Sequence, residues 1–167
     1  QGLMPTYASE VFAVSASGLG LFISAIGVGG LLGALTIATL GDIRYKGRVL
    51  IGSLMVAALA ASIFSQMQSV VSAIPPLVLA AGATTSFFAV SAATIHSVIP
   101  EEMRSRIASI ASMTLGGLII GSVASGTLAG LMGAPSATLI GAFVLGVYVV
   151  TVSALFPELR SFGQKGE

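Results

Sequence analysis

The sequence predicts an all-α membrane protein whose five apolar helices cross the bilayer. Hydrophobic residues occupy 55% of the 167 positions and charged residues only 8%, whereas a soluble domain is usually about 25% charged. The mean hydropathy is +1.03. The apolar residues form three long charge-free runs separated by short clusters of charge, which is the pattern of spans and loops in a membrane protein.

The length of each charge-free run sets the number of helices it holds, because one crossing takes roughly 20 residues. The first run, Val11–Gly41, has room for one helix, which the terminal glycine would end. The second run, Val49–Pro100, has room for two. We expect a break at Ser65–Pro76, where glutamines, serines and a Pro-Pro pair interrupt the apolar pattern.

The third run, Ile107–Pro157, divides in the same way at Gly133–Ser136. Ahead of the bundle, residues 1–15 are expected to be the end of a truncated helix and an outer turn. The transmembrane bundle covers 16–156, and 157–167 form a cytoplasmic tail. The expected spans are 16–40, 48–65, 76–98, 105–131 and 136–156.

The positions of the basic residues support this division independently. If five spans alternate between the two sides of the membrane, all seven Lys and Arg residues fall on one side, which the positive-inside rule identifies as cytoplasmic. Buried helices of a soluble protein would not segregate charge in this way. The seven residues are Arg44, Lys46, Arg48, Arg104, Arg106, Arg160 and Lys165.

Glycine is abundant, with 21 residues, and several glycines are spaced four apart along the first and fourth spans. This spacing puts small residues on one helix face and lets two backbones approach closely in a membrane. We therefore expect these faces to pack against neighbouring helices. The glycines concerned are Gly29 and Gly33 in the first span, and Gly117, Gly121, Gly126 and Gly130 in the fourth.

Several classes of function find no support in the sequence. The absence of cysteine excludes disulfides and cysteine-based metal sites, and no other metal-ligand cluster is present. There is no nucleophile–base pair and no phosphate-binding loop, so we expect neither an enzyme nor a bound cofactor. The net charge of +1, without a basic stripe, argues against nucleic acid as a partner.

The most informative motif is the charged loop Gly41–Arg48, with the sequence Gly-Asp-Ile-Arg-Tyr-Lys-Gly-Arg. It resembles the cytoplasmic loop motif of the major facilitator superfamily, in which Gly-Asp closes one helix and Gly-Arg opens the next. The matching residues are Gly41, Asp42, Gly47 and Arg48, with Arg44 and Lys46 between them. The spacing is longer than usual and resembles the looser copy in the C-terminal half of that superfamily.

A second loop strengthens the resemblance. The stretch Val98–Arg106 is similar to the Val-Pro-x-Glu-x-Arg-Gly-Arg sequence between the tenth and eleventh helices, with Ser105 in place of the usual glycine. Proline followed by acidic residues also makes a good helix start, so capping alone explains part of this pattern. The whole pattern resembles the enterobactin-exporter-like branch. The loop residues singled out are Pro100, Glu101, Arg104 and Arg106.

The resemblance implies that the chain is the C-terminal half of a transporter, from the end of helix seven through helix twelve. Its partners would be the lipid bilayer of a bacterial-type plasma membrane, a missing N-terminal six-helix half and a small-molecule substrate. The substrate cavity in this fold lies between the halves, near the bilayer midplane, and opens alternately to each side. A small-molecule exporter is therefore expected. Any proton-carrying residue would lie in the other half, since the only Asp, Glu, Lys or Arg residues in the predicted spans are Arg48 and Arg106, at the cytoplasmic ends of their spans.

The inner layer of the bundle is expected to be formed by the first, third and fourth spans, because hydroxyl side chains concentrate in the third and fourth. The second and fifth spans would face lipid. Candidate residues of the substrate path are Thr84, Thr85, Phe87, Ser91 and Ser112.

The loop Gly41–Arg48 has two possible roles. Its basic residues orient the chain in the membrane, and under the resemblance Asp42 would also latch onto helix ends of the opposite half. An alternative for the whole chain is a standalone small membrane protein that serves as a structural or assembly subunit. The sequence encoded directly upstream would distinguish a transporter half from a standalone subunit.

Overall fold

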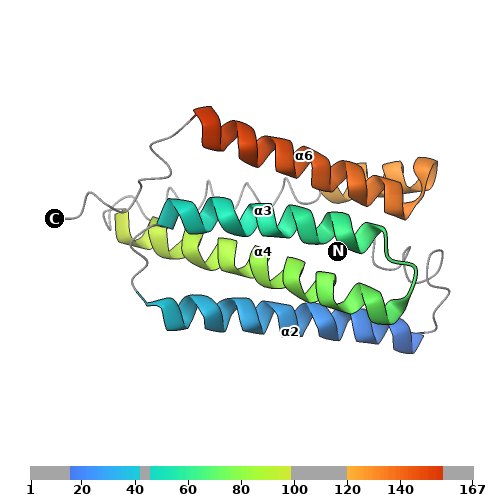
Figure 1. Ribbon diagram of the computed structural model, residues 1–167, viewed down its shortest axis with the longest axis horizontal. Helices are drawn as coiled ribbons and strands as arrows, with labels where there is room; N and C mark the ends of the chain where they lie inside the picture. Colours follow the sequence, from blue (N-terminus) through green and yellow to red (C-terminus); the bar gives the residue numbers. More distant parts are fainter. Residues whose placement is uncertain (1–15, 42–45, 99–119, 156–167) are drawn as a thin grey trace.

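The computed structural model describes residues 16–41, 46–98 and 120–155, and these fold almost entirely into helices. No strand occurs within these three ranges. Four helices are long and apolar enough to cross a membrane (Figure 1). The expected all-α membrane architecture is therefore confirmed. The helices are α2 (Ala16–Leu40), α3 (Lys46–Ser65), α4 (Val70–Val98) and α6 (Ala134–Leu155), and a shorter helical segment covers Ile120–Met132.

The four long helices pack in a fixed order across the bundle. α4 contacts both α2 and α3, and α3 in turn contacts α6 (Figure 1). The two middle helices are therefore α4 and α3. α3 also keeps an exposed apolar side, which includes Val56, Leu59 and Ile63. The expectation that the second span faces lipid stays a prediction.

Glycines bring α2 and α4 together at their closest approach. A Cβ built on Gly33 would clash with the backbone carbonyl of Gly82 and lie 2.9 Å from its Cα. A Cβ on Gly29 would clash with the carbonyl of Val78 and lie 2.9 Å from the Ala81 Cβ. Backbone therefore meets backbone here, which is the geometry that small residues permit within a membrane.

A buried apolar cluster ties the helices together at one end of the bundle. Its centre is an edge-to-face pair formed by Phe22 of α2 and Phe64 of α3, with ring centroids 6.4 Å apart. Aromatic pairs of this kind contribute about 0.5–1.5 kcal/mol beyond area burial. The cluster lies at the end where α3 leads into α4. Its other members are Ala25, Ala73, Leu77, Ala129, Ala134 and Ala137.

The connection between α3 and α4 is shorter than expected from the sequence. α3 closes with hydrogen bonds from the Gln66 and Met67 amides, and α4 already begins at Val70, after Ser69. The expected break at Ser65–Pro76 was too wide, because the Pro75-Pro76 pair lies inside α4. Membrane helices tolerate interior prolines when neighbouring groups satisfy the backbone carbonyls that lose their donors.

Two glycines in the left-handed conformation end helices. Gly41 follows α2 with φ of 61°, and Gly133 follows the segment Ile120–Met132 with φ of 83°. The Gly133 amide donates to the Ala129 carbonyl at 2.8 Å, which closes the last turn. Only glycine adopts this conformation without strain, so both positions fix where the chain turns.

The contact between α2 and α4 leads to a first prediction. Gly33→Ala should lower the stability of the folded protein by about 1–3 kcal/mol, because the new methyl group overpacks against the Gly82 backbone. Gly27→Ala on the same helix is the matched control, since a Cβ there meets no atom of the described residues within 4 Å. We would measure thermal unfolding of the purified protein in detergent. Equal midpoints for the two variants would contradict the packing.

Candidate functional site

The sequence singled out five candidate residues of a substrate path, and four of them lie on α4. These are Thr84, Thr85, Phe87 and Ser91, whereas Ser112 lies outside the described residues. Thr84 is at the middle of α4 (Val70–Val98), the depth at which a membrane-spanning helix meets the bilayer centre. The helix turns by about 100° per residue, so the spacing of these residues decides which of them share a face.

One face of α4 carries Thr84, Phe87 and Ser91, together with Phe88. On a helical wheel they fall within about 100° of one another. Thr84 is exposed, Phe88 is 55% exposed, and Phe87 and Ser91 are part-buried. The two rings meet edge to face, with centroids 5.6 Å apart. This face, which we call the α4 polar-aromatic face, combines hydroxyl groups with a broad apolar surface.

Thr85 does not belong to this face. It points toward α2, where a Cβ built on Gly30 would lie 3.3 Å from its Oγ1. The next residue, Ser86, donates a hydrogen bond from its Oγ to the Gly33 carbonyl on α2 at 3.3 Å. Thr85 and Ser86 therefore help to join two helices, and the structure separates them from the candidates on the exposed face.

Most hydroxyl groups in the described helices bond to the backbone of their own helix. Thr84 donates to the Ala80 carbonyl at 2.8 Å, and Ser62 on α3 donates to the Ala58 carbonyl at 2.9 Å. A hydroxyl satisfied in this way can sit on any face of a membrane helix. The number of hydroxyls on a helix is consequently a poor guide to whether that helix faces inward.

Part of the charged loop is described. Gly41 ends α2, Lys46 begins α3, Gly47 is buried and Arg48 is exposed. Two cations in the first turn of a helix oppose its dipole, at a cost of about 0.3–1 kcal/mol each. Helix stability therefore does not account for them. The remaining predicted loop residues, Asp42, Arg44, Pro100, Glu101, Arg104 and Arg106, lie outside the described residues.

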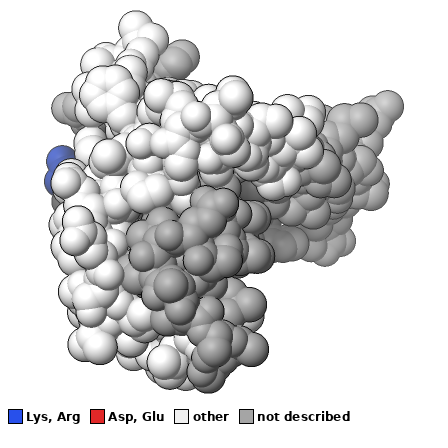
Figure 2. All heavy atoms as spheres, turned by 90° about the vertical axis from the view of Figure 1, so that its right-hand side faces the viewer, with Lys and Arg blue, Asp and Glu red and all other residues white. Residues whose placement is uncertain are grey.

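The rest of the described surface is almost free of charge. Figure 2 shows a single blue patch of Lys and Arg at the edge of a face that is otherwise white or undescribed. Within the described ranges the charged residues are Lys46 and Arg48, both at the start of α3. Those ranges contain no group of three potential metal ligands.

The glycines of the fourth span behave differently from those of the first. Gly121, Gly126 and Gly130 lie on the segment Ile120–Met132, and a Cβ on any of them would meet no described atom within 4 Å. The close packing expected for these three glycines is therefore not found within the described part of the chain. The segment contacts the apolar cluster through Leu128 and Ala129 instead. Gly117 lies outside the described residues.

The sequence of the chain matches one known protein family over nearly its whole length. The family described as Major Facilitator Superfamily matches residues 1–165, nearly the whole length. The chain belongs to the Major Facilitator Superfamily. Members of this superfamily are membrane transporters rather than enzymes, so this member is an integral membrane protein of the transporter class. Searches of curated proteins and of solved structures returned no significant match.

The orientation of α4 gives a second prediction, which uses the absence of cysteine from this chain; any cysteine in the rest of the transporter is first replaced by serine. In the complete transporter, Thr84→Cys should react with a small hydrophilic thiol reagent at least tenfold faster than Thr85→Cys. The first side chain lies on the exposed face, whereas the second packs against Gly30. Labelling rates in native membranes measure the difference. Equal rates, or faster labelling of Thr85→Cys, would contradict the assignment.

Proposed function

We propose that the chain forms the C-terminal six-helix half, from the end of helix seven through helix twelve, of a secondary transporter that exports small, fairly apolar molecules. The two halves of the transporter rock against each other and expose the substrate alternately to each side of the membrane. The observation that carries this proposal is the α4 polar-aromatic face. It lies at mid-helix, its residues Thr84 and Phe88 are exposed, and it is separate from Thr85 and Ser86, which turn toward α2.

The chemistry of that face matches an apolar substrate with few polar groups. Phe87 and Phe88 offer a surface for dispersion and stacking contacts, and Thr84 and Ser91 add hydroxyl groups that fix orientation. No Asp, Glu, Lys or Arg occurs in the described helices beyond the start of α3. A strongly charged substrate would thus find no opposite charge on this wall, and leaving it unpaired in the membrane is costly.

The branch, the partner half and the orientation in the membrane follow from the loop motifs. The Gly-Asp…Gly-Arg pattern of Gly41–Arg48 and the stretch Val98–Arg106 support the enterobactin-exporter-like branch. The partner is the N-terminal six-helix half, which supplies the opposite wall of the cavity and the ion-coupling group. The membrane is a bacterial-type plasma membrane, with the charged loops and the C-terminal tail cytoplasmic, as the basic residues on one side indicate.

A transport assay tests the proposal. Inside-out membrane vesicles that contain the complete transporter should accumulate fluorescent apolar dyes, and vesicles without it should not. Ser91→Ala should raise the KM for the dye about two- to tenfold, the effect of losing one hydrogen bond worth about 0.5–1.5 kcal/mol.

The control for this assay is Ser72→Ala. Ser72 is an exposed serine on the same helix, close to its start, and its Oγ donates to the Ser69 carbonyl at 2.9 Å. It lies on a different face of α4 from Ser91. Dye accumulation that does not depend on the transporter, or equal KM changes for the two variants, would rule out the proposed path.

The charged loop acts as a cytoplasmic latch in this mechanism. Asp42 contacts helix ends of the N-terminal half in the state closed toward the cytoplasm, where a carboxylate near a helix N-terminus gains about 0.3–1 kcal/mol. The contact is lost when the halves rock apart. Lys46 and Arg48, which oppose the dipole of their own helix, fix the orientation of this loop at the membrane surface.

The latch leads to a further prediction. Asp42→Asn in the full-length protein should reduce the population closed toward the cytoplasm about two- to fivefold, as removal of such a contact requires. Asp42→Glu retains the charge and is the matched control. Distances between spin labels on the two halves report the populations. Unchanged transport together with unchanged populations would exclude the latch.

A further inference from the structure

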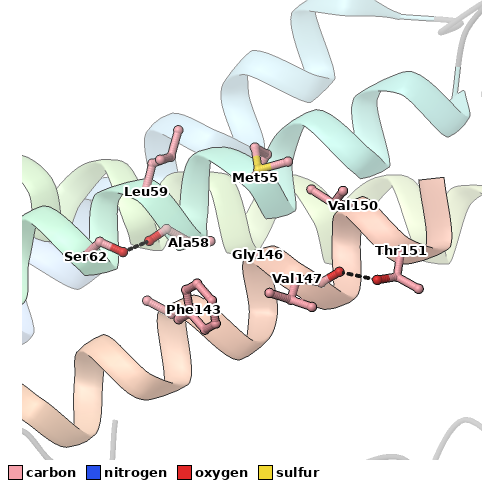
Figure 3. Close-up of a pocket in the computed structure, with 10 residues that line it drawn as sticks. Met55, Ala58, Leu59, Ser62, Phe143, Gly146, Val147, Val150 and Thr151 are labelled. Atoms are coloured by element: carbon pink, nitrogen blue, oxygen red, sulfur yellow. Dashed lines mark hydrogen bonds between the residues drawn. The ribbon is translucent and has the colours of Figure 1, made fainter. Parts of the chain in front are cut away.

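A groove of about 370 Å³ lies between α3 and α6, on a part of the bundle that the transport mechanism does not use (Figure 3). Small residues form its floor. Ala58 and Ala142 are 4% and 6% exposed, and a Cβ built on Gly146 meets no described atom within 4 Å. Larger side chains form the walls, namely Met55 and Leu59 from α3, and Phe143, Val147 and Val150 from α6.

The lining offers no free polar group to an occupant. Its two hydroxyls belong to Ser62 and Thr151, which donate to the Ala58 carbonyl at 2.9 Å and the Val147 carbonyl at 2.7 Å. Figure 3 shows both bonds running along their own helices. The groove therefore suits an apolar occupant that needs no directional hydrogen bond. Its volume lies at the low end of the roughly 300–1,000 Å³ typical of small-ligand pockets.

The groove opens onto an exposed apolar side of the bundle, where Leu59, Phe143 and Val150 are each more than half exposed. α3 and α6 are both long and apolar enough to cross the membrane, and Met55 and Phe143 lie near their midpoints. Phe143 is 73% exposed in the described structure, so its outer edge meets the hydrocarbon of the bilayer. An acyl chain from the surrounding lipid can enter the groove sideways without crossing any polar barrier.

Arg48, a basic residue in the first turn of α3, lies on the same face of that helix as the groove residues Met55 and Leu59. Arg48, Met55 and Leu59 fall within about 40° of one another on a helical wheel. Arg48 is exposed at the end of the helix, and Met55 lies seven residues farther on, about 10 Å along the axis. Half of the hydrocarbon core is about 15 Å thick, so a lipid whose phosphate meets Arg48 places the lower part of its acyl chain at the depth of the groove.

We propose that this groove binds one acyl chain of an anionic diacyl phospholipid, whose phosphate pairs with the Arg48 guanidinium. The apolar lining takes the chain, and the positive charge at the head of the same helix face selects the headgroup. A basic side chain near the membrane surface favours an anionic lipid by about fivefold. The bound lipid thus supports the outer face of the half-bundle, away from the α4 polar-aromatic face.

The chain has no tryptophan, so a tryptophan introduced into it can serve as a local probe once every tryptophan in the rest of the full-length protein has been replaced by phenylalanine. Phe143→Trp places a single indole at the groove, and Tyr148→Trp places one on the opposite side of α6, where the tyrosine is 60% exposed. Full-length protein is reconstituted into phosphatidylcholine vesicles doped with phosphatidylglycerol, with bromine on the acyl chains of one lipid at a time. At Phe143→Trp, the two brominated lipids are compared by the mole fraction that quenches half of the fluorescence. This mole fraction should be about five times lower for phosphatidylglycerol than for phosphatidylcholine. At Tyr148→Trp the two lipids should quench equally.

Second variants locate the lipid within the groove. Adding Gly146→Leu to Phe143→Trp should abolish the preference by filling the groove, whereas Gly141→Leu should leave it intact. Gly141 is an exposed glycine on the far side of α6, and a Cβ there also meets no described atom within 4 Å. Adding Arg48→Gln to Phe143→Trp should remove the preference, so that the two brominated lipids quench equally at the same mole fraction.

Three results would overturn the proposal. One is equal quenching by the two lipids at Phe143→Trp, which would mean ordinary bulk-lipid contact. The second is a preference that survives Gly146→Leu. The third is weaker quenching at Phe143→Trp than at Tyr148→Trp for both lipids, which would mean that a second copy of the chain covers the groove. The comparison of the two tryptophan variants remains decisive if Gly146→Leu does not fold.

Discussion

The structure depends on one backbone contact, the meeting of Gly29 and Gly33 on α2 with Gly82 and its neighbours on α4. Helices in lipid gain little from the hydrophobic effect, so close packing has to hold them together. Here two backbones come so close that a single Cβ would collide with the opposite chain. The contact fixes how far apart α2 and α4 lie, and it also fixes the rotation of α4 about its own axis.

That rotation determines which side chains are available for function. Because Gly82, Thr85 and Ser86 turn toward α2, Thr84 and Phe88 on the other side of α4 are left exposed. α3 covers a further part of α4, and the large side chains of the apolar cluster are confined to one end of the bundle. The α4 polar-aromatic face is thus a side of the helix that α2 does not occupy. The same packing order leaves the groove between α3 and α6 on a different side of the bundle.

The sequence predicted the fold class well, because charge distribution and apolar length report directly on which segments can lie in lipid. It predicted the candidate site less well. Hydroxyl content was used to sort helices into inner and outer ones, but hydroxyls such as that of Ser62 bond within their own helix and carry no information about neighbours. Thr84 and Thr85 are equivalent in the sequence, and only the packing of the second against Gly30 separates them. Likewise, Gly33 and Gly126 share the same spacing pattern, yet only Gly33 has a helix against it among the described residues.

Oxidative cross-linking tests the rotation of α4 most directly. The pair Gly30→Cys with Thr85→Cys should form a disulfide in native membranes, because a Cβ at position 30 lies 3.3 Å from the Thr85 Oγ1. Disulfides require Cβ atoms about 3.5–4.5 Å apart, a range that this approach of a Cβ to the γ atom of residue 85 allows. This chain has no cysteine to interfere, and any cysteine in the rest of the transporter is replaced by serine. The pair Gly30→Cys with Thr84→Cys should remain reduced under the same oxidant. Efficient cross-linking of the second pair without the first would show that α4 is rotated differently, and the assignment of its exposed face would then be wrong.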